Sequence, residues 1–132
     1  MIVVSGGFDP IHSGHIDHIR KASELGELTV IVSTDEQLRK KKGFCLLPLR
    51  DRMDVISSLR YVSDVVGNID TDGTSTNTLL SLQPDIFVKG GDRTEANMPQ
   101  SEIDACIKMG CKIIYGLGDL LNSSTNLVKD MK

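Results

Sequence analysis

Short apolar runs alternate with amphipathic helical patterns along this chain of 132 residues. Strands are predicted over 1–6, 28–33, 62–66, 86–88 and 112–115, and helices over 14–25, 35–41, 49–59, a stretch ending near 82, 99–109 and from 123 onward. Short strands that are apolar on both faces are typical of a parallel sheet covered by helices on both sides. The expected fold is a doubly wound α/β domain, a single one over residues 1–132.

Composition and charge exclude several classes of protein. The formal net charge is −3, with 3 Phe, 2 Tyr and no Trp, so a general nucleic-acid binder is not expected. The three cysteines form no CxxC pair, which favours a reduced protein over a disulfide scaffold. The opening apolar run lacks the basic flank and cleavage pattern of a signal peptide, and no run is long enough to span a membrane. The expectation is a cytoplasmic protein without a membrane or nucleic-acid partner.

All three histidines follow the first predicted strand, in the run GGFDPIHSGHIDH from Gly6 to His18. Turns at the carboxyl end of a parallel strand present backbone N–H groups and the positive end of a helix dipole, which suits phosphates. Gly14 allows a ligand to approach the backbone closely, so that His12 and His15 can both donate to one anion. A histidine that merely caps or packs is the structural alternative. No metal site is expected, because His12 precedes the helix and no zinc-enzyme pattern is completed.

Basic and hydroxyl-bearing residues recur on the other loops that this topology gathers at the same edge of the sheet. The run from Ser33 to Gly43 includes Lys42, although most such runs are solvated basic helix ends. Arg52 lies at a helix start, where a cation opposes the dipole and needs an anion or a carboxylate nearby. Two further groups follow the fourth strand and begin the last helix: Lys89, Gly90, Gly91 and Asp92, then Ser123, Ser124 and Thr125.

In this order the segments resemble the HxGH nucleotidyltransferases, the cytidylyltransferase-like family. GGFDPIHSGH is similar to the family signature GxFDxxHxGH, and the segment from Pro84 to Asp92 resembles the family's nucleotide-binding strand and loop. The runs STDE, RKKKG and PLRDRM also match, and NSSTNLVK resembles the hydroxyl-rich start of the last helix. The resemblance spans almost the whole chain.

The resemblance implies a role for each matching residue. His12 and His15 would contact the triphosphate and act with Lys42 in catalysis, while Asp9, Lys42 and Arg52 would bind the acceptor substrate. Mg²⁺ would accompany the nucleoside triphosphate, and the protein would be a homodimer. The nucleotide-binding residues implied are Gly7, Phe8, Asp9, Gly14, Lys89, Gly90, Gly91, Asp92, Ser123, Ser124 and Thr125.

The implied reaction transfers a nucleoside monophosphate to a sugar phosphate and releases pyrophosphate. A phosphate monoester is mostly dianionic at neutral pH, so no protein base is required and catalysis rests on positioning and charge stabilisation. The runs at 89–92 and 123–129 most resemble family members that transfer an adenylyl group to heptose 1-phosphate, so the expected product is ADP-heptose. The runs STDE and RYV resemble family members that transfer a cytidylyl group from CTP to glycerol 3-phosphate, which is the alternative reaction. A non-catalytic nucleotide or sugar-phosphate sensor on the same fold stays open, as does a plain interaction module.

Overall fold

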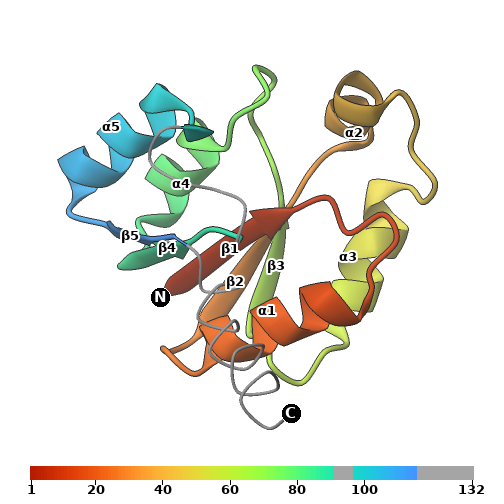
Figure 1. The fold of residues 1–132 in the computed structure, drawn as a ribbon, viewed down its shortest axis with the longest axis horizontal. Helices are drawn as coiled ribbons and strands as arrows, with labels where there is room; N and C mark the ends of the chain where they lie inside the picture. Colours follow the sequence, from red (N-terminus) through yellow and green to blue (C-terminus); the bar gives the residue numbers. More distant parts are fainter. Residues whose placement is uncertain (91–96, 116–132) are drawn as a thin grey trace, which may run out of the picture.

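A five-stranded parallel sheet forms the centre of the protein in a computed structural model that describes residues 1–90 and 97–115 (Figure 1). The strand order is β3-β2-β1-β4-β5, with every neighbouring pair parallel. The strands are β1 (Ile2–Gly6), β2 (Leu28–Val32), β3 (Asp64–Gly67), β4 (Ile86–Val88) and β5 (Lys112–Ile114). The helices are α1 (Ser13–Ser23), α2 (Asp35–Lys42), α3 (Leu49–Ser57), α4 (Thr76–Leu82) and α5 (Gln100–Met109).

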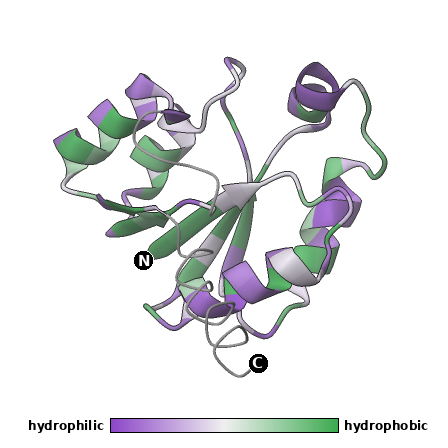
Figure 2. Ribbon diagram, viewed as in Figure 1, coloured by the Kyte–Doolittle hydropathy of each residue, from purple (hydrophilic) through white to green (hydrophobic). Residues whose placement is uncertain are grey.

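Two separate apolar cores lie on the two faces of the sheet, because successive strand side chains point to opposite faces. Val4 of β1 packs in one core with Ile19 of α1 and Ile56 of α3. Its neighbour Val3 packs in the other core with Leu79 of α4 and with α5. Apolar residues accordingly colour the strands in Figure 2, whereas hydrophilic residues prevail on the outer helix surfaces. The predicted doubly wound α/β fold is confirmed.

The strand order reverses at β1, and this reversal positions the site. β1 pairs with β2 on one side and with β4 on the other. The chain leaves β1 toward the face covered by α1, and it leaves β4 toward the face covered by α5. Ligands of open α/β sheets bind in the crevice that such a switch point creates beyond the carboxyl ends of the strands. The histidine turn and the segment after β4 meet at this crevice.

Several element boundaries differ by a few residues from the predicted ones. α1 begins at Ser13, because His12 adopts extended backbone angles and caps the helix. β3 begins at Asp64, since the N–H of Val62 is used in a turn to the carbonyl of Leu59. The helix predicted from residue 123 lies outside the described residues. In the described part of the chain, no helix has the length and apolar character needed to cross a membrane.

Adjacent residues of α3 offer a matched test of the α1/α3 core. Ile56 is fully buried, whereas 41% of Val55 is exposed. We expect Ile56→Ala to lower the free energy of unfolding by about 2–5 kcal/mol through lost burial and a cavity. Val55→Ala is expected to change it by no more than about 0.5 kcal/mol, because it alters a surface position. Urea unfolding measures both, and equal losses would contradict this packing.

Candidate active site

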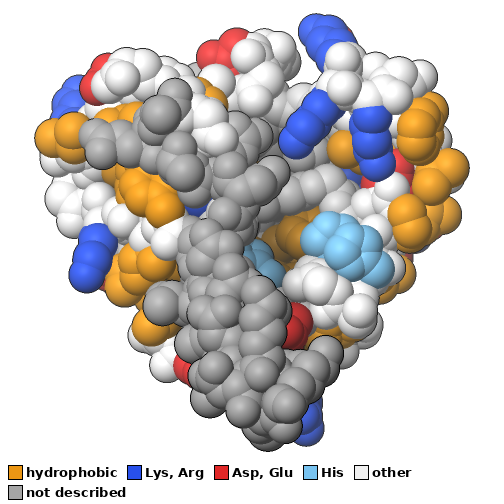
Figure 3. All heavy atoms as spheres, in the orientation of Figure 1, with side chains coloured by type: hydrophobic (Ala, Val, Ile, Leu, Met, Phe, Trp, Pro, Cys, Tyr) orange, Lys and Arg blue, Asp and Glu red, His pale blue; other side chains and the backbone are white. Residues whose placement is uncertain are grey.

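A cavity of about 920 Å³ opens at the carboxyl edge of the sheet. Its walls come from the turn after β1, the start of α1, α2, the β3–α4 loop, the end of β4 and the start of α5. Figure 3 shows histidine side chains (pale blue) beside a hollow on this side of the molecule, with Lys and Arg side chains (blue) over α2. The predicted site residues that line it are Gly7, Phe8, Gly14, His15, Lys89 and Gly90.

His12 and His15 cap the start of α1 reciprocally. The N–H of Gly14 donates to Nδ1 of His12, and the N–H of His12 donates to Nδ1 of His15, both at 3.1 Å. The two rings stack with centroids 3.7 Å apart and planes 26° from parallel. A ring nitrogen that accepts a hydrogen bond carries no proton, so this network assigns the proton of each neutral imidazole to Nε2. Each histidine is therefore left with an Nε2–H group as a donor.

The environment of His15 keeps its ring uncharged at neutral pH. Burial, followed by the positive charges of His12, His18 and Lys42, lowers the pKa of His15 to about 4. Burial and Lys89 also lower the pKa of His18. At neutral pH the His15 imidazole can donate a hydrogen bond to an anion without bringing a formal charge. Positive charge beside the histidine turn comes instead from Lys42.

Gly14 makes room for the ring of His12. A Cβ atom at position 14 would stand 3.0 Å from Cε1 and 3.2 Å from Nδ1 of His12. The sequence predicted that Gly14 leaves room for a ligand to approach the backbone. In the structure, the ring of His12 lies in the space that a side chain at position 14 would need. Phe8 supports the pair from the other side, with its ring edge-on to His15 at a centroid distance of 5.1 Å. Packing thus holds both rings in place.

Arg52 is buried, and its guanidinium group binds protein acceptors instead of facing the cavity. Nη1 donates to the carbonyls of Gly7 (2.9 Å) and Ser33 (2.6 Å), and Nε donates to the carbonyl of Leu47 (2.8 Å). Nη2 binds the carboxylate of Asp35 at 2.7 Å. Burial opposes ionisation of Asp35, but hydrogen bonds, that from Arg52 above all, hold its pKa below the usual value. The sequence predicted an anion or a carboxylate near this arginine, with a substrate phosphate as the expected partner, whereas in the structure the carboxylate of Asp35 is the partner.

Asp9 is also turned inward. Its fully buried carboxylate accepts the N–H groups of Leu46 (2.6 Å) and Leu47 (2.8 Å). Burial alone would raise the pKa of Asp9, but these two bonds and the nearby cations lower it. Lys42 donates to the carbonyl of Asp9 at 2.9 Å. Lys42 therefore stands beside the histidine turn, outside the cavity lining, while Lys40 and Lys41 line the cavity.

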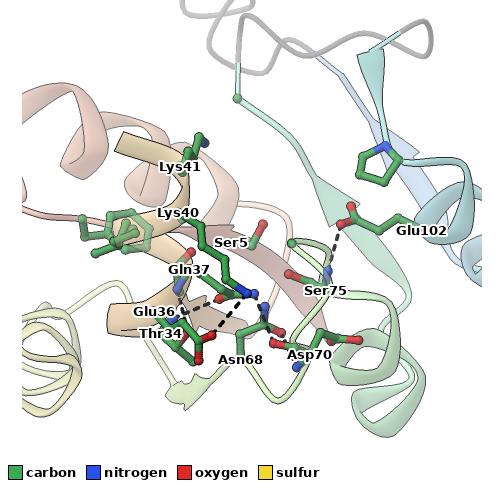
Figure 4. Close-up of a pocket in the computed structure, with 18 of the residues that line it drawn as sticks. Ser5, Thr34, Glu36, Gln37, Lys40, Lys41, Asn68, Asp70, Ser75 and Glu102 are labelled. Atoms are coloured by element: carbon green, nitrogen blue, oxygen red, sulfur yellow. Dashed lines mark hydrogen bonds and ion pairs between the residues drawn. The ribbon is translucent and has the colours of Figure 1, made fainter. Parts of the chain in front are cut away.

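The cavity also contains residues that sequence reasoning did not select. Asn68 and Asp70 follow β3 and lie across from α2, where Nε2 of Gln37 donates to the carbonyl of Asp70 at 3.2 Å (Figure 4). His18, to which the sequence assigned no role, lines the cavity, as does Glu102 of α5. The sequence contained one signal for Asn68 and Asp70, because the polar stretch 68–77 follows directly after a predicted strand.

Some predicted residues are not placed by the structure. Gly91, Asp92, Ser123, Ser124 and Thr125 lie outside the described residues. Over 1–90 and 97–115, no three His, Cys, Asp or Glu side chains are grouped as potential metal ligands. The Nδ1 atoms of His12 and His15 and the Asp9 carboxylate are all used by backbone N–H groups. The histidine turn thus offers hydrogen-bond donors and, through Lys42, a cation, whereas carboxylates line the cavity at Glu36, Asp70 and Glu102.

Removing the Arg52 guanidinium should unfold the site. We expect Arg52→Ala to lower the free energy of unfolding by about 3–5 kcal/mol, because it leaves Asp35 and three carbonyls without their partner. Arg52→Lys should not restore the loss, since one ammonium cannot replace the planar fork. Arg50→Ala, on the exposed face of α3, is the control. A normal stability for Arg52→Ala, measured by urea unfolding, would argue against this role.

The lowered pKa of His15 predicts a pH dependence of stability. Between pH 6.5 and about 4, His15 binds a proton in the unfolded chain but not in the folded protein. Its contribution is therefore complete above pH 6.5 and declines as the pH falls toward 4. His15→Asn, which keeps an acceptor near the Nδ1 position, should flatten this decline in urea unfolding measured on both sides of pH 6.5. An unchanged slope would show that His15 titrates normally.

Comparison with known proteins agrees with this geometry. The family model described as "Cytidylyltransferase-like" matches residues 3–115. FAD synthase of Pyrococcus horikoshii is 43% identical over 95 residues, which cover 70% of this chain and 63% of that protein. Bifunctional protein HldE of Alcanivorax borkumensis is 40% identical over 135 aligned positions, covering 100% of this chain and 28% of that protein.

A solved structure shows the same arrangement. The lipopolysaccharide core biosynthesis protein from Thermoplasma volcanium superposes with a TM-score of 0.73 at 27% sequence identity. The match covers 86% of this chain and 93% of that one. The strand order, the capped histidine turn and the family match over residues 3–115 all indicate the same family. The chain belongs to the cytidylyltransferase-like family of nucleotidyltransferases.

Proposed function

We propose that the protein transfers the adenylyl group of ATP to a phosphorylated small molecule and releases pyrophosphate. The observation that carries this proposal is the stacked, reciprocally capped pair His12 and His15 at the start of α1. Two Nε2–H donors, a helix N-terminus and the nearby Lys42 ammonium form an environment suited to a polyphosphate. Oxygen of the acceptor phosphate would attack the α-phosphorus in line, and the bond to pyrophosphate would break.

The chain's own residues would contribute position and charge. His12 and His15 would donate to phosphoryl oxygens on which charge builds, and Lys42 would stand beside the transferred phosphate or the acceptor phosphate. The resemblance implied that Arg52 and Asp9 bind the acceptor, but both bind protein groups, so we propose instead that they are positioning residues that hold the surrounding loops. We further propose a nucleotide-binding role for Gly7, Phe8, Gly14, Lys89, Gly90, Gly91, Asp92, Ser123, Ser124 and Thr125.

Magnesium would enter with the nucleotide as part of the substrate. Mg²⁺ in nucleotide sites is held largely by phosphate oxygens and water, with few protein ligands. The shortage of grouped carboxylates among the described residues fits that arrangement. The ion would screen the phosphate charges, while the histidines and Lys42 hold the phosphates in place.

The similar proteins suggest two candidate acceptor substrates. Similarity to HldE, an ADP-heptose synthase, and to a lipopolysaccharide core biosynthesis protein supports heptose 1-phosphate, with ADP-heptose as product. Similarity to FAD synthase at 43% identity supports FMN as a second candidate acceptor. Both products contain an adenylyl group, which favours ATP over the CTP that a glycerol-3-phosphate cytidylyltransferase would use.

A pyrophosphate-release screen tests this function. ATP and CTP are each combined with heptose 1-phosphate, FMN and glycerol 3-phosphate in the presence of Mg²⁺. We expect release with ATP and one of the first two acceptors. Absence of release for every combination, together with measurable ATP binding, would instead identify a non-catalytic nucleotide sensor on this fold.

Loss of either Nε2–H donor should slow turnover without unfolding the turn. Asparagine at position 12 or 15 keeps an acceptor near Nδ1 but has no group at the Nε2 position. We expect His12→Asn and His15→Asn each to lower kcat by roughly a hundredfold, as for other donors to developing negative charge. Asp17→Asn, which alters an exposed ion pair with Arg20 on the same helix, is the matched control. Unchanged steady-state pyrophosphate release by both histidine variants would remove them from the mechanism.

A further inference from the structure

Two buried side-chain atoms among the described residues have no hydrogen-bond partner, and both belong to residues that line the cavity. They are Nδ1 of His18 and Oε1 of Glu102. The Glu102 side chain is only 5% exposed. A buried charged oxygen without a partner costs free energy that a bound donor would recover. Glu102 is therefore the stronger indication of a ligand contact.

The position of the Glu102 carboxylate is set by its other oxygen. Oε2 accepts the N–H of Ser75, at the start of α4, at 2.9 Å (Figure 4). Oε1 lies 3.8 Å from Nζ of Lys89, close enough for charge compensation but too far for a hydrogen bond. Lys89 is held near this position by the ring of Phe87, 4.6 Å from Nζ, and by Ser5, 3.5 Å from it. The carboxylate is thus fixed, compensated and left with one acceptor atom.

A ligand group that contacts Oε1 of Glu102 must be a hydrogen-bond donor. A phosphate would be repelled by the carboxylate, whereas a hydroxyl can donate a hydrogen bond to Oε1. This arrangement suits the alcohol groups of a sugar or polyol chain.

The location of Glu102 favours the acceptor over the nucleotide. The histidine pair stands on the α1 side of the sheet, whereas Ser75 and Glu102 belong to the side covered by α4 and α5. In-line transfer requires the attacking and leaving oxygens on opposite sides of the transferred phosphorus. A triphosphate at His12 and His15 leaves the other side of the cavity to the acceptor.

We propose that Glu102 is a specificity-determining residue that accepts a hydrogen bond from a hydroxyl group of the acceptor substrate. This inference rests on the proposed function. The acceptor class is then a hydroxylated phosphate monoester. Heptose 1-phosphate and FMN, whose phosphate is carried on a ribityl chain, both belong to this class. The hydroxyl requirement separates this class from phosphate monoesters on purely apolar chains.

The test compares Glu102→Gln with the unaltered protein on acceptors that have and lack each hydroxyl. Glutamine can keep an acceptor for the N–H of Ser75 while it replaces Oε1 by an NH₂ group. Calorimetric titration with heptose 1-phosphate and its monodeoxy analogues, and with FMN and an analogue bearing an alkyl chain, measures binding directly. A non-reactive ATP analogue is present throughout, and pyrophosphate release provides KM in parallel.

We expect Glu102→Gln to weaken binding of the hydroxylated acceptor, and to raise its KM, by about tenfold or more. One deoxy analogue should bind the unaltered protein weakly, and the variant should bind that analogue and the parent acceptor equally. Affinity for the ATP analogue should stay unchanged. Asp104→Asn, the same chemical change on the exposed side of α5, is the control and should leave all these quantities unaltered.

The outcomes separate this inference from the proposed function. Pyrophosphate release with an undiminished hydroxyl preference in Glu102→Gln would overturn the role of Glu102 and leave the function standing. A weakened affinity for the ATP analogue in place of the acceptor would assign Glu102 to the nucleotide and also overturn the inference. Hydroxyl-dependent binding that Glu102→Gln abolishes, in a protein that releases no pyrophosphate, would support Glu102 and reject the function. Far-ultraviolet circular dichroism and the Tm establish that both variants are folded.

Discussion

The buried Arg52 guanidinium connects segments that the rest of the site depends on. Its hydrogen bonds reach the turn after β1 at Gly7, the end of β2 at Ser33, the start of α2 at Asp35 and the loop before α3 at Leu47. Parallel strands place these segments at one edge of the sheet, but the sheet hydrogen bonds end before the loops begin. A planar, permanently charged fork with several donors can join backbone carbonyls and a carboxylate at once, which few other side chains can do. The site is therefore built around a cation that does not face it.

Asp9 also connects segments of the site, with a negative charge in place of the positive charge of Arg52. Its carboxylate receives two N–H groups of the loop before α3, and Lys42 closes the contact from the end of α2. The histidine turn is thus held by Arg52 through Gly7 and by Asp9 through Leu46 and Leu47. Such rigid support matters for a reaction in which no protein base is needed and catalysis depends on where the phosphates are held.

The two ends of the cavity have different chemistry because they lie on different faces of the sheet. On the α1 side, the rings of His12 and His15 accept backbone N–H groups at Nδ1 and so keep Nε2–H as a donor, His15 stays neutral, and Lys42 supplies charge. On the α4 and α5 side, Glu102 brings an acceptor that would oppose a phosphate but suit a hydroxyl. Under the proposed function, one continuous cavity would therefore distinguish a nucleotide from a hydroxylated acceptor. The reversal of strand order at β1 is what brings both faces to the same opening.

The sequence by itself determined the class of fold, the succession of elements and the histidine turn. Apolar periodicity depends on local pattern, and the turn residues from Gly6 to His15 are neighbours in the chain, so both can be read without coordinates. Tertiary structure alone decided the direction in which Arg52 and Asp9 point, because their partners are supplied by loops up to 45 residues away. It also decided that Glu102 and Ser75, 27 residues apart, share a hydrogen bond, and that the other oxygen of Glu102 is buried without a partner in a residue that lines the cavity. Whether a charged side chain binds substrate or protein depends on which donors and acceptors surround it, and packing brings those together.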